Sequence, residues 1–455
     1  MRNGAAVLVI LAAGPLCGAS FQAGAARVDI TPPPGLPLYG YTERTQLSTG
    51  TLDPLYARAI VLQVGEKRLA LVTLDLGRVF GQRSLSGLRD RLTKESGISY
   101  LLITASHTHS GPNILDEYPS NRTPAWETAA LDKIARAVGQ ACERLTDARL
   151  GTGYGRAYIG YNRRRVFPDG SVTMFWQNPD KIPTEPVDPT VSVLRIDTAA
   201  GKPLAILVNY ACHPVVLGPH DLKYSADYVG IMTRTVDQSF GDNGTSPLCL
   251  FLQGGDGDIN PYYADTSEAK DAIKNRDWTG EELGREAARI AQATKTLSTA
   301  EASLQFYEDS MTFPVRWNAQ KFRQGMIAAY GPSVYEDHAE LLNSDHPPTS
   351  LAVPVVSILL NKSIAFAGLP GEPFVDFQID WRKRCPVRDA FFVGYANAYV
   401  DYLPTIQAAT QGGYGAGDSN TYLAVGAGER MIDQALMRVY EMLGRLPDVP
   451  EDLKK

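Results

Sequence analysis

His107 and His109 are separated by one residue and follow a short apolar run. Because side chains at positions i and i+2 of an extended segment point to the same face, the two imidazoles can converge on one point. Imidazole is a common protein ligand of zinc and related metals, so this pair indicates a metal site. The alternative is a surface loop that carries two polar residues.

Two further polar clusters follow apolar runs in the middle of the chain. His213 comes after the run 204–210, where a histidine either binds a metal or hydrogen-bonds a backbone carbonyl. A glycine-rich segment, 253–261, follows another such run and supplies Asp258 as an acceptor and Asn260 as an amide donor. Glycines let the backbone approach a ligand closely, although a plain glycine-rich turn would have the same composition.

Glu372 and a tyrosine-rich segment make up the last two clusters. Glu372 precedes Pro373, and because proline favours the first position of a helix, Glu372 is predicted to be the N-cap. The helix dipole stabilises an ionised carboxylate there, which suits both a cap and a metal ligand. The segment 395–405 contains Tyr399 and Tyr402. Tyrosines are usually packing residues, so taken alone this segment favours a structural role.

Short apolar runs alternate with helical patterns along the chain. The runs that we expect to be strands are 59–62, 69–74, 100–104, 204–208, 248–252 and 364–367. Helical patterns cover 82–95, 125–145, 280–297, 374–384 and 429–445. Apolar runs without strict alternation indicate a sheet that is covered on both faces. We therefore predict the α/β class, with a layered mixed β-sheet covered by helices on both faces.

The polar clusters fall where predicted strands end, which is where open α/β sheets bind their ligands. Asp75 also follows a predicted strand and is a candidate hydrogen-bond acceptor for a metal-bound imidazole. We treat 24–445 as a single large catalytic domain, followed by a polar C-terminal tail, 446–455. The less regular stretch 303–360 is expected to be an insertion or a cap over the sheet.

The N-terminus has the pattern of a secretory signal peptide. Arg2 precedes an apolar run, 5–13, and small residues follow, so we assign 1–20 to the signal peptide. The run is shorter than the roughly 20 apolar residues that a membrane span needs. We expect a secreted or periplasmic protein without a transmembrane segment. A net charge of −6 over 455 residues, without a long Lys/Arg run, argues against binding to nucleic acid through phosphate neutralisation.

Taken together and in this order, the five clusters resemble the neutral ceramidase family, over the catalytic N-terminal domain of its members. In that family, zinc is held by two histidines, a glutamate in a P-G-E turn and a tyrosine near an N-x-Y segment. The resemblance implies one zinc ion per chain, held by His107, His213, Glu372 and Tyr402. It also implies active-site roles for His109, Arg163 and Tyr414.

One position departs from the family pattern. The family motif G-D-V-S-P-N carries a serine, and Asn260 occupies the place of that serine in the matching segment, 257–262. An amide can donate a hydrogen bond but cannot be acylated. We therefore expect direct attack by zinc-activated water rather than an acyl-enzyme intermediate.

The predicted function is hydrolysis of a linear amide bond in N-acylsphingosine or a related N-acyl compound. His109 or Asp258 would handle protons in this reaction. Arg163, Asn260 and Tyr414 would orient the substrate or stabilise the oxyanion. A lipid substrate would bring the protein into peripheral contact with membrane lipid. Two alternatives stay open: a hydrolase of a different exported ester or amide, and a metal-binding homologue with weak catalysis.

Overall fold

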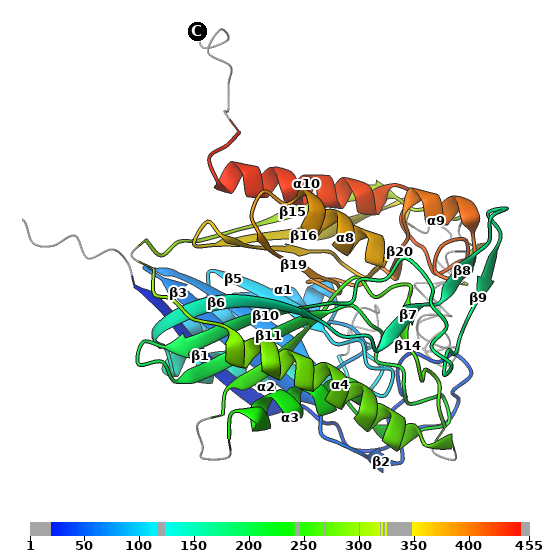
Figure 1. The fold of residues 1–455 in the computed structure, drawn as a ribbon, viewed down its shortest axis with the longest axis horizontal. Helices are drawn as coiled ribbons and strands as arrows, with labels where there is room; N and C mark the ends of the chain where they lie inside the picture. The colour runs from blue at the N-terminus through cyan, green and yellow to red at the C-terminus, as the bar shows by residue number, and fades with distance from the viewer. Residues whose placement is uncertain are drawn as a thin grey trace, which may run out of the picture.

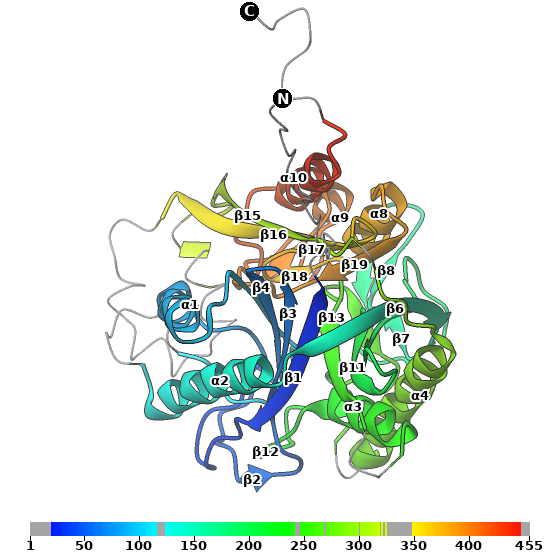
Figure 2. The same cartoon turned by 90° about the vertical axis from the view of Figure 1, so that its left-hand side faces the viewer.

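The computed structural model describes residues 20–115, 123–241, 246–267, 270–299, 301–318, 320–321, 324 and 348–446. Over these residues the chain forms two main β-sheets stacked face to face, with helices on the outer face of each (Figures 1 and 2). The predicted signal peptide lies outside the described residues except for Ser20, and the predicted tail lies outside them except for Leu446. None of the helices in the described ranges is long and apolar enough to cross a bilayer.

The larger sheet has eight strands. Across the sheet they are β13 (Leu248–Gln253), β11 (Pro203–Tyr210), β10 (Thr190–Thr198), β6 (Thr146–Arg156), β1 (Phe21–Asp29), β3 (Tyr56–Val64), β4 (Lys67–Leu74) and β5 (Tyr100–Ala105). The edge pairs β4–β5 and β11–β13 are parallel, and the pairs between them are antiparallel. Parallel neighbours need a crossover connection, and α1 (Gln82–Ser96) and α3 (Asp227–Ser239) provide the two crossovers.

The smaller sheet also has a parallel pair of strands at one edge, joined by a crossover helix. Across the sheet its strands are β15 (Leu304–Pro314), β16 (Ser350–Leu360), β17 (Ile364–Gly368) and β19 (Asp389–Val393). The β17–β19 pair is parallel and is joined through α8 (Val375–Arg384). The short strand pairs at the loops are β2 (Gly50–Thr51) with β12 (Lys223–Tyr224), β7 (Gly160–Asn162) with β14 (Ile259–Pro261), β8 (Arg164–Val166) with β9 (Val172–Met174), and β18 (Glu372–Pro373) with β20 (Tyr402–Leu403).

Amphipathic helices cover the outer faces of both sheets (Figure 2). The larger sheet carries α1, α2 (Ala125–Glu143), α3 and α4 (Ala272–Ala293), and the smaller sheet carries α8 and α10 (Ala427–Met442). A short helix, α9 (Ile406–Gln411), follows β20. In α10, the buried residues Met431, Ile432, Ala435 and Val439 recur at a spacing of three or four, which keeps one stripe of the helix on the sheet.

The inner faces of the two sheets form one apolar layer. Leu71, Leu207 and Leu250 of the larger sheet and Ile358 and Phe366 of the smaller sheet belong to the same buried cluster. Both faces of the central strands are therefore removed from water, which is why their sequences are continuously apolar rather than alternating.

The structure confirms the predicted α/β class, the mixed sheet and the six predicted strands. It differs from the prediction in one respect: helices cover only one face of the larger sheet, and the smaller sheet covers the other. The expectation of an insertion or cap at 303–360 is wrong at its two ends, where β15 and β16 are paired strands of the smaller sheet. The helix predicted at 280–297 spans 272–293 instead. Our strand prediction did not include β1, β6 and β10, and glycine and charged residues interrupt the apolar pattern of the first two.

Candidate active site

The candidate site lies where strands of both sheets end. His107 follows β5 and His213 follows β11 in the larger sheet, whereas Glu372 follows β17 in the smaller sheet. Glu372 is the register partner of Tyr402 in the parallel pair β18–β20. Residues that are far apart in the sequence thus meet at one end of the molecule, on the right in Figure 1.

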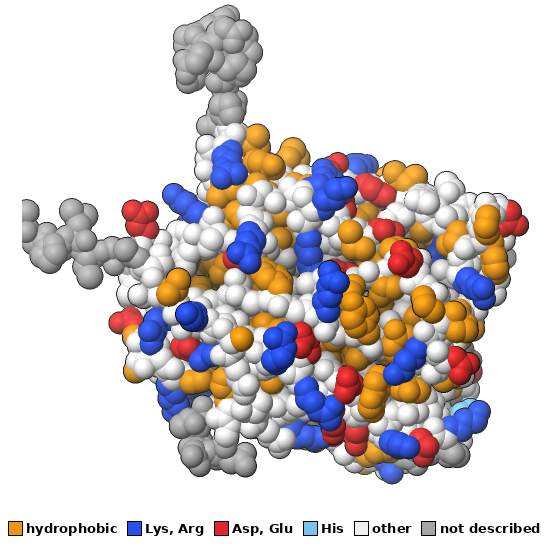
Figure 3. Space-filling view, in the orientation of Figure 1, with side chains coloured by type: hydrophobic (Ala, Val, Ile, Leu, Met, Phe, Trp, Pro, Cys, Tyr) orange, Lys and Arg blue, Asp and Glu red, His pale blue; other side chains and the backbone are white. Residues whose placement is uncertain are grey.

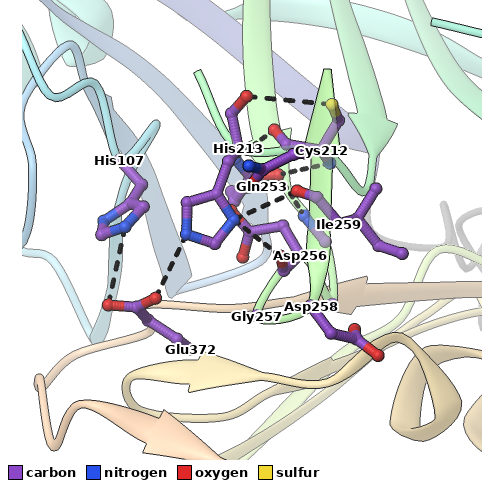
Figure 4. Close-up of polar contacts among 12 residues, drawn as sticks. His107, Cys212, His213, Gln253, Asp256, Gly257, Asp258, Ile259 and Glu372 are labelled. Carbon is purple, nitrogen blue, oxygen red and sulfur yellow. Dashed lines mark hydrogen bonds and ion pairs between the residues drawn. The ribbon is translucent and has the colours of Figure 1, made fainter. Parts of the chain in front are cut away.

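Glu372 lies beneath two imidazoles, each of which faces one oxygen of its carboxylate (Figure 4). The distance is 3.5 Å from His107 Nε2 to Glu372 Oε1 and 3.2 Å from His213 Nε2 to Glu372 Oε2. His109 Nε2 lies 3.2 Å from His107 Nε2. One ring nitrogen from each of the three histidines falls within 4.8 Å of the other two. The two histidines of the H-x-H pair therefore do converge.

Backbone carbonyls orient the two imidazoles that face Glu372. His107 Nδ1 lies 2.6 Å from Gly77 O, and His213 Nδ1 lies 2.7 Å from Asp256 O. A carbonyl can only accept a hydrogen bond, so the network assigns the proton to Nδ1 in both rings and directs the other nitrogen, Nε2, toward the carboxylate. His107 has a φ of 70°, a left-handed conformation that turns its side chain into the site.

The electrostatics of these groups suit a cation. Burial lowers the pKa of His107 to about 4, so its imidazole is neutral and Nε2 presents a lone pair. Burial disfavours an ionised Glu372, but the two imidazoles and a hydroxyl outweigh it and lower the pKa of Glu372 to about 2. A lone pair and an ionised carboxylate that face each other are both stabilised by a positive ion between them. Two imidazole nitrogens and a carboxylate are a donor set that fits zinc.

Arg163 is buried beside this group and its guanidinium is held by three acceptors. Nη2 donates to Gly257 O at 2.7 Å and to the Tyr402 hydroxyl at 2.9 Å, and Nη1 donates to Asn260 Oδ1 at 3.2 Å. Burial lowers the pKa of Arg163, but the neighbouring phenols and Glu372 have the larger combined effect and raise it above its usual value. The buried Nε of Arg163 has no hydrogen-bond partner among the described residues.

Tyr414 and Trp176 extend the site toward solvent. The Tyr414 ring lies 5.4 Å from the Tyr402 ring and 5.2 Å from Arg163 Cζ. Trp176 contacts the Tyr414 ring edge-on at 5.2 Å and is 43% exposed. The three aromatic rings form a continuous path from the surface to Arg163.

Asp258 has partners that differ from our expectation for a proton-transfer group. Its Oδ1 accepts a hydrogen bond from Val375 N at 2.9 Å, and its Oδ2 accepts one from Asn162 Nδ2 at 2.7 Å. Val375 is the first residue of α8, so Asp258 supplies the carboxylate at this helix N-terminus. The prediction that Glu372 caps α8 is wrong, because Glu372 belongs to β18 and faces the histidines.

The proposed role for Asp75 is also wrong. Asp75 forms a buried ion pair with Arg58 at 2.6 Å and accepts a hydrogen bond from Tyr56 N, and Gly77 O is the acceptor for His107 instead. A backbone acceptor leaves no signature in side-chain types, so the sequence could not indicate it.

Sequence reasoning gave no role to three residues that contact the candidate ligands. The Tyr399 hydroxyl donates to Glu372 Oε1 at 2.7 Å, and the Tyr395 ring stacks on the His107 ring at 4.4 Å. The Asp256 carbonyl accepts from His213, and its side chain accepts from the Tyr395 hydroxyl at 2.9 Å. The available signal was the density of tyrosines in 395–402, directly after a buried strand.

Known proteins match this chain in sequence and in fold. The model of the family "Neutral/alkaline non-lysosomal ceramidase, N-terminal" matches residues 21–270. A neutral ceramidase of Pseudomonas aeruginosa is 29% identical over 195 residues, which cover 40% of this chain and 28% of that protein. A neutral ceramidase of Mycobacterium tuberculosis is 24% identical over 462 residues, which cover 84% of this chain and 71% of that protein.

The fold is similar to a solved structure of neutral ceramidase from Pseudomonas aeruginosa. The TM-score is 0.74 at 20% sequence identity, and the match covers 95% of this chain and 76% of that chain. At this identity the likeness concerns the fold, and it extends beyond the family model's last matched residue into the smaller sheet, which supplies Glu372 and Tyr402.

Proposed function

This chain belongs to the neutral/alkaline non-lysosomal ceramidase family, and from that membership we propose that it is a zinc-dependent hydrolase of linear amide bonds. The proposed substrate is a ceramide-like compound, N-acylsphingosine or a related N-acyl molecule. The single observation that carries the proposal is the convergence of His107 and His213 on the two oxygens of Glu372. The apolar segment at residues 5–13 supports export to the periplasm or the medium.

In this proposal zinc is held by His107, His213, Glu372 and Tyr402. Bound zinc would supply Lewis-acid activation of water and of the scissile carbonyl. Tyr402 is supported as a ligand by its pairing with Glu372, while its hydroxyl accepts a hydrogen bond from Arg163. Burial raises the pKa of the Tyr402 phenol well above its usual value, and the positive charge of Arg163 beside it acts in the opposite direction.

The remaining residues handle the substrate and the proton. Arg163 is fixed by its three acceptors, and its positive charge can stabilise the substrate oxygen that becomes negative during amide cleavage. His109 is the candidate that accepts and returns the proton, because its Nε2 lies within the histidine cluster, 3.2 Å from His107 Nε2. Asn260 holds Arg163, and Tyr414 lies over the same guanidinium.

The first experiment is a substrate screen of the zinc-loaded protein. N-acylsphingosines in mixed micelles, N-acyl amino acids and simple esters would be compared by product release. We expect amide hydrolysis that falls at least about 1,000-fold in Glu372→Ala, since a lost ligand removes the metal site. Glu282→Ala, at an exposed glutamate on α4 paired with Arg285, is the matched control and should retain activity.

The time course of the same reaction tests the route. Because Asn260 cannot be acylated, product release should begin without a burst. A burst with a trapped acyl adduct would contradict direct attack by water. Hydrolysis that survives in Glu372→Ala would contradict the assigned centre, and absence of turnover on every substrate would contradict the proposed function.

A further inference from the structure

A buried hydroxyl contacts the candidate metal ligand Glu372 from the side away from His213. The Tyr399 hydroxyl lies 2.7 Å from Oε1, which His107 Nε2 approaches only to 3.5 Å, whereas His213 Nε2 lies 3.2 Å from Oε2. An ionised carboxylate can only accept, so the Tyr399 proton must point to Oε1. The two oxygens of Glu372 are therefore not equivalent, because a hydroxyl donates to Oε1 and, within the part of the chain that the structure describes, no hydroxyl donates to Oε2.

A second hydroxyl orients the first. The Tyr39 hydroxyl lies 2.9 Å from the Tyr399 hydroxyl, in a contact between residues 360 positions apart. Since Tyr399 uses its proton on Glu372, its oxygen can only accept, and Tyr39 must be the donor. Both side chains are buried, with exposed fractions of 3% for Tyr39 and 7% for Tyr399. In this setting a chain of hydroxyls has a defined direction and each bond strengthens the next.

The backbone that carries Tyr399 is held in an unusual conformation. Tyr395, Asn397 and Asp401 all have positive φ, at 54°, 57° and 61°. The Asn397 side chain accepts from Ile103 N at 2.8 Å and donates to Leu101 O at 3.1 Å, so it fastens the loop to β5. Strained residues persist only where the surroundings hold them, and they cluster at functional sites. The loop thus ties Tyr399 to the strand that leads to His107.

We propose that Tyr399 is a positioning residue for the metal, which holds Glu372 through Oε1 so that Oε2 is the oxygen offered to the ion, and that Tyr39 acts through Tyr399. This inference rests on the proposed function, because it takes Glu372 as a ligand. A merely structural tyrosine at this place would contribute to folding stability and leave metal affinity unchanged.

The test is metal affinity in single and double variants. The dissociation constant of zinc would be measured by chelator competition on wild type, Tyr399→Phe, Tyr39→Phe and the double variant. Loss of a partner that orients a ligand typically weakens metal binding about 10- to 100-fold, and we expect this for Tyr399→Phe. Tyr39→Phe should have a smaller effect, and the double variant should equal Tyr399→Phe, because Tyr39 acts only through Tyr399.

A second readout is the visible spectrum of the Co²⁺-substituted protein, which reports the ligand set directly. We expect the spectrum to change in Tyr399→Phe. Tyr154→Phe is the matched control, because its hydroxyl also donates to a carboxylate, Asp389, at 2.8 Å but lies on β6. This control should leave both the zinc affinity and the spectrum as in wild type.

The outcomes separate this inference from the proposed function. Unchanged zinc affinity and Co²⁺ spectrum in Tyr399→Phe would overturn the inference even if the wild type hydrolyses amides. A weakened site in Tyr399→Phe would support it even if the wild type turns over no substrate. Should Tyr399→Phe not fold, Tyr39→Phe decides: a weaker zinc site supports the inference, and wild-type affinity overturns it.

Discussion

At the scale of single residues, the hydrogen bonds of Arg163 support its proposed role in catalysis. Its guanidinium donates to a backbone carbonyl, an amide oxygen and a phenol at once. Only a planar fork with several N–H groups can satisfy that set of acceptors. Asn260 is one of these acceptors, so it helps to hold Arg163 in place.

Replacing Arg163 by lysine should therefore impair catalysis without emptying the metal site. A lysine keeps the charge but cannot make the fork, and loss of an oxyanion donor typically lowers kcat by about 100- to 1,000-fold. Steady-state kinetics on the best amide substrate would measure this, and zinc content would be measured in parallel. Arg165→Lys, at an exposed neighbouring position, is the control. A kcat within a few-fold of wild type in Arg163→Lys would contradict the assigned role.

At the scale of elements, two helices are fastened to neighbouring strands and loops by carboxylates, one buried (Asp258) and one half-buried (Asp237). Asp258 does this for α8, and Asp237 does it for α3, where its Oδ1 accepts from Cys249 N at 2.7 Å. Burial raises the pKa of Asp237 to about 6, above the value of about 3.9 expected in an unfolded chain. The folded state therefore binds this proton more tightly than the unfolded state does.

The sign of the pH effect follows from that difference. The stabilisation from the Asp237 proton is complete below about pH 4 and is lost as the pH rises through about 6. Asp237→Asn keeps an acceptor for Cys249 and does not titrate. Relative to wild type, the free energy of unfolding of this variant should rise by about 1 to 3 kcal/mol between pH 4 and pH 7. Urea unfolding in the presence of a chelator would measure it, and parallel profiles for the two proteins would contradict the prediction.

At the scale of the whole molecule, the candidate ligands come from two sheets, so the site depends on how the sheets are stacked. His107 and His213 extend from the larger sheet, and Glu372 extends from the smaller one. On the face seen in Figure 3, basic and acidic side chains are interspersed.

The apolar layer between the sheets should then control both stability and metal binding. Phe366 is buried in this layer and stacks on Phe391 at 4.9 Å. Phe366→Ala should lower the free energy of unfolding by about 3 to 5 kcal/mol and weaken zinc binding, because β17 leads directly to Glu372. Denaturant unfolding and chelator competition would measure the two effects. Met437→Ala, at an exposed position of α10, is the control, and a destabilised Phe366→Ala with wild-type zinc affinity would contradict the coupling.

Much of the fold and part of the site were predictable from local sequence. Periodicity and apolar content identified six strands, and residue type with motif order identified His107, His213 and Glu372 as candidates. These are properties of short segments, because burial on both faces of a strand imposes an apolar run and metal binding demands particular donor atoms. The convergence of three motifs was expected from their common position at strand ends.

Tertiary structure alone decided which partner each group meets. Glu372 is the carboxylate that precedes α8 in the sequence, yet Asp258 accepts the hydrogen bond from Val375 N at the helix end, and Glu372 faces the histidines. The Tyr39–Tyr399 contact joins residues from opposite ends of the chain, and the acceptors for His107 and His213 are backbone carbonyls. Hydrogen-bond partners of this kind depend on how the two sheets stack, which no local pattern of residue types encodes.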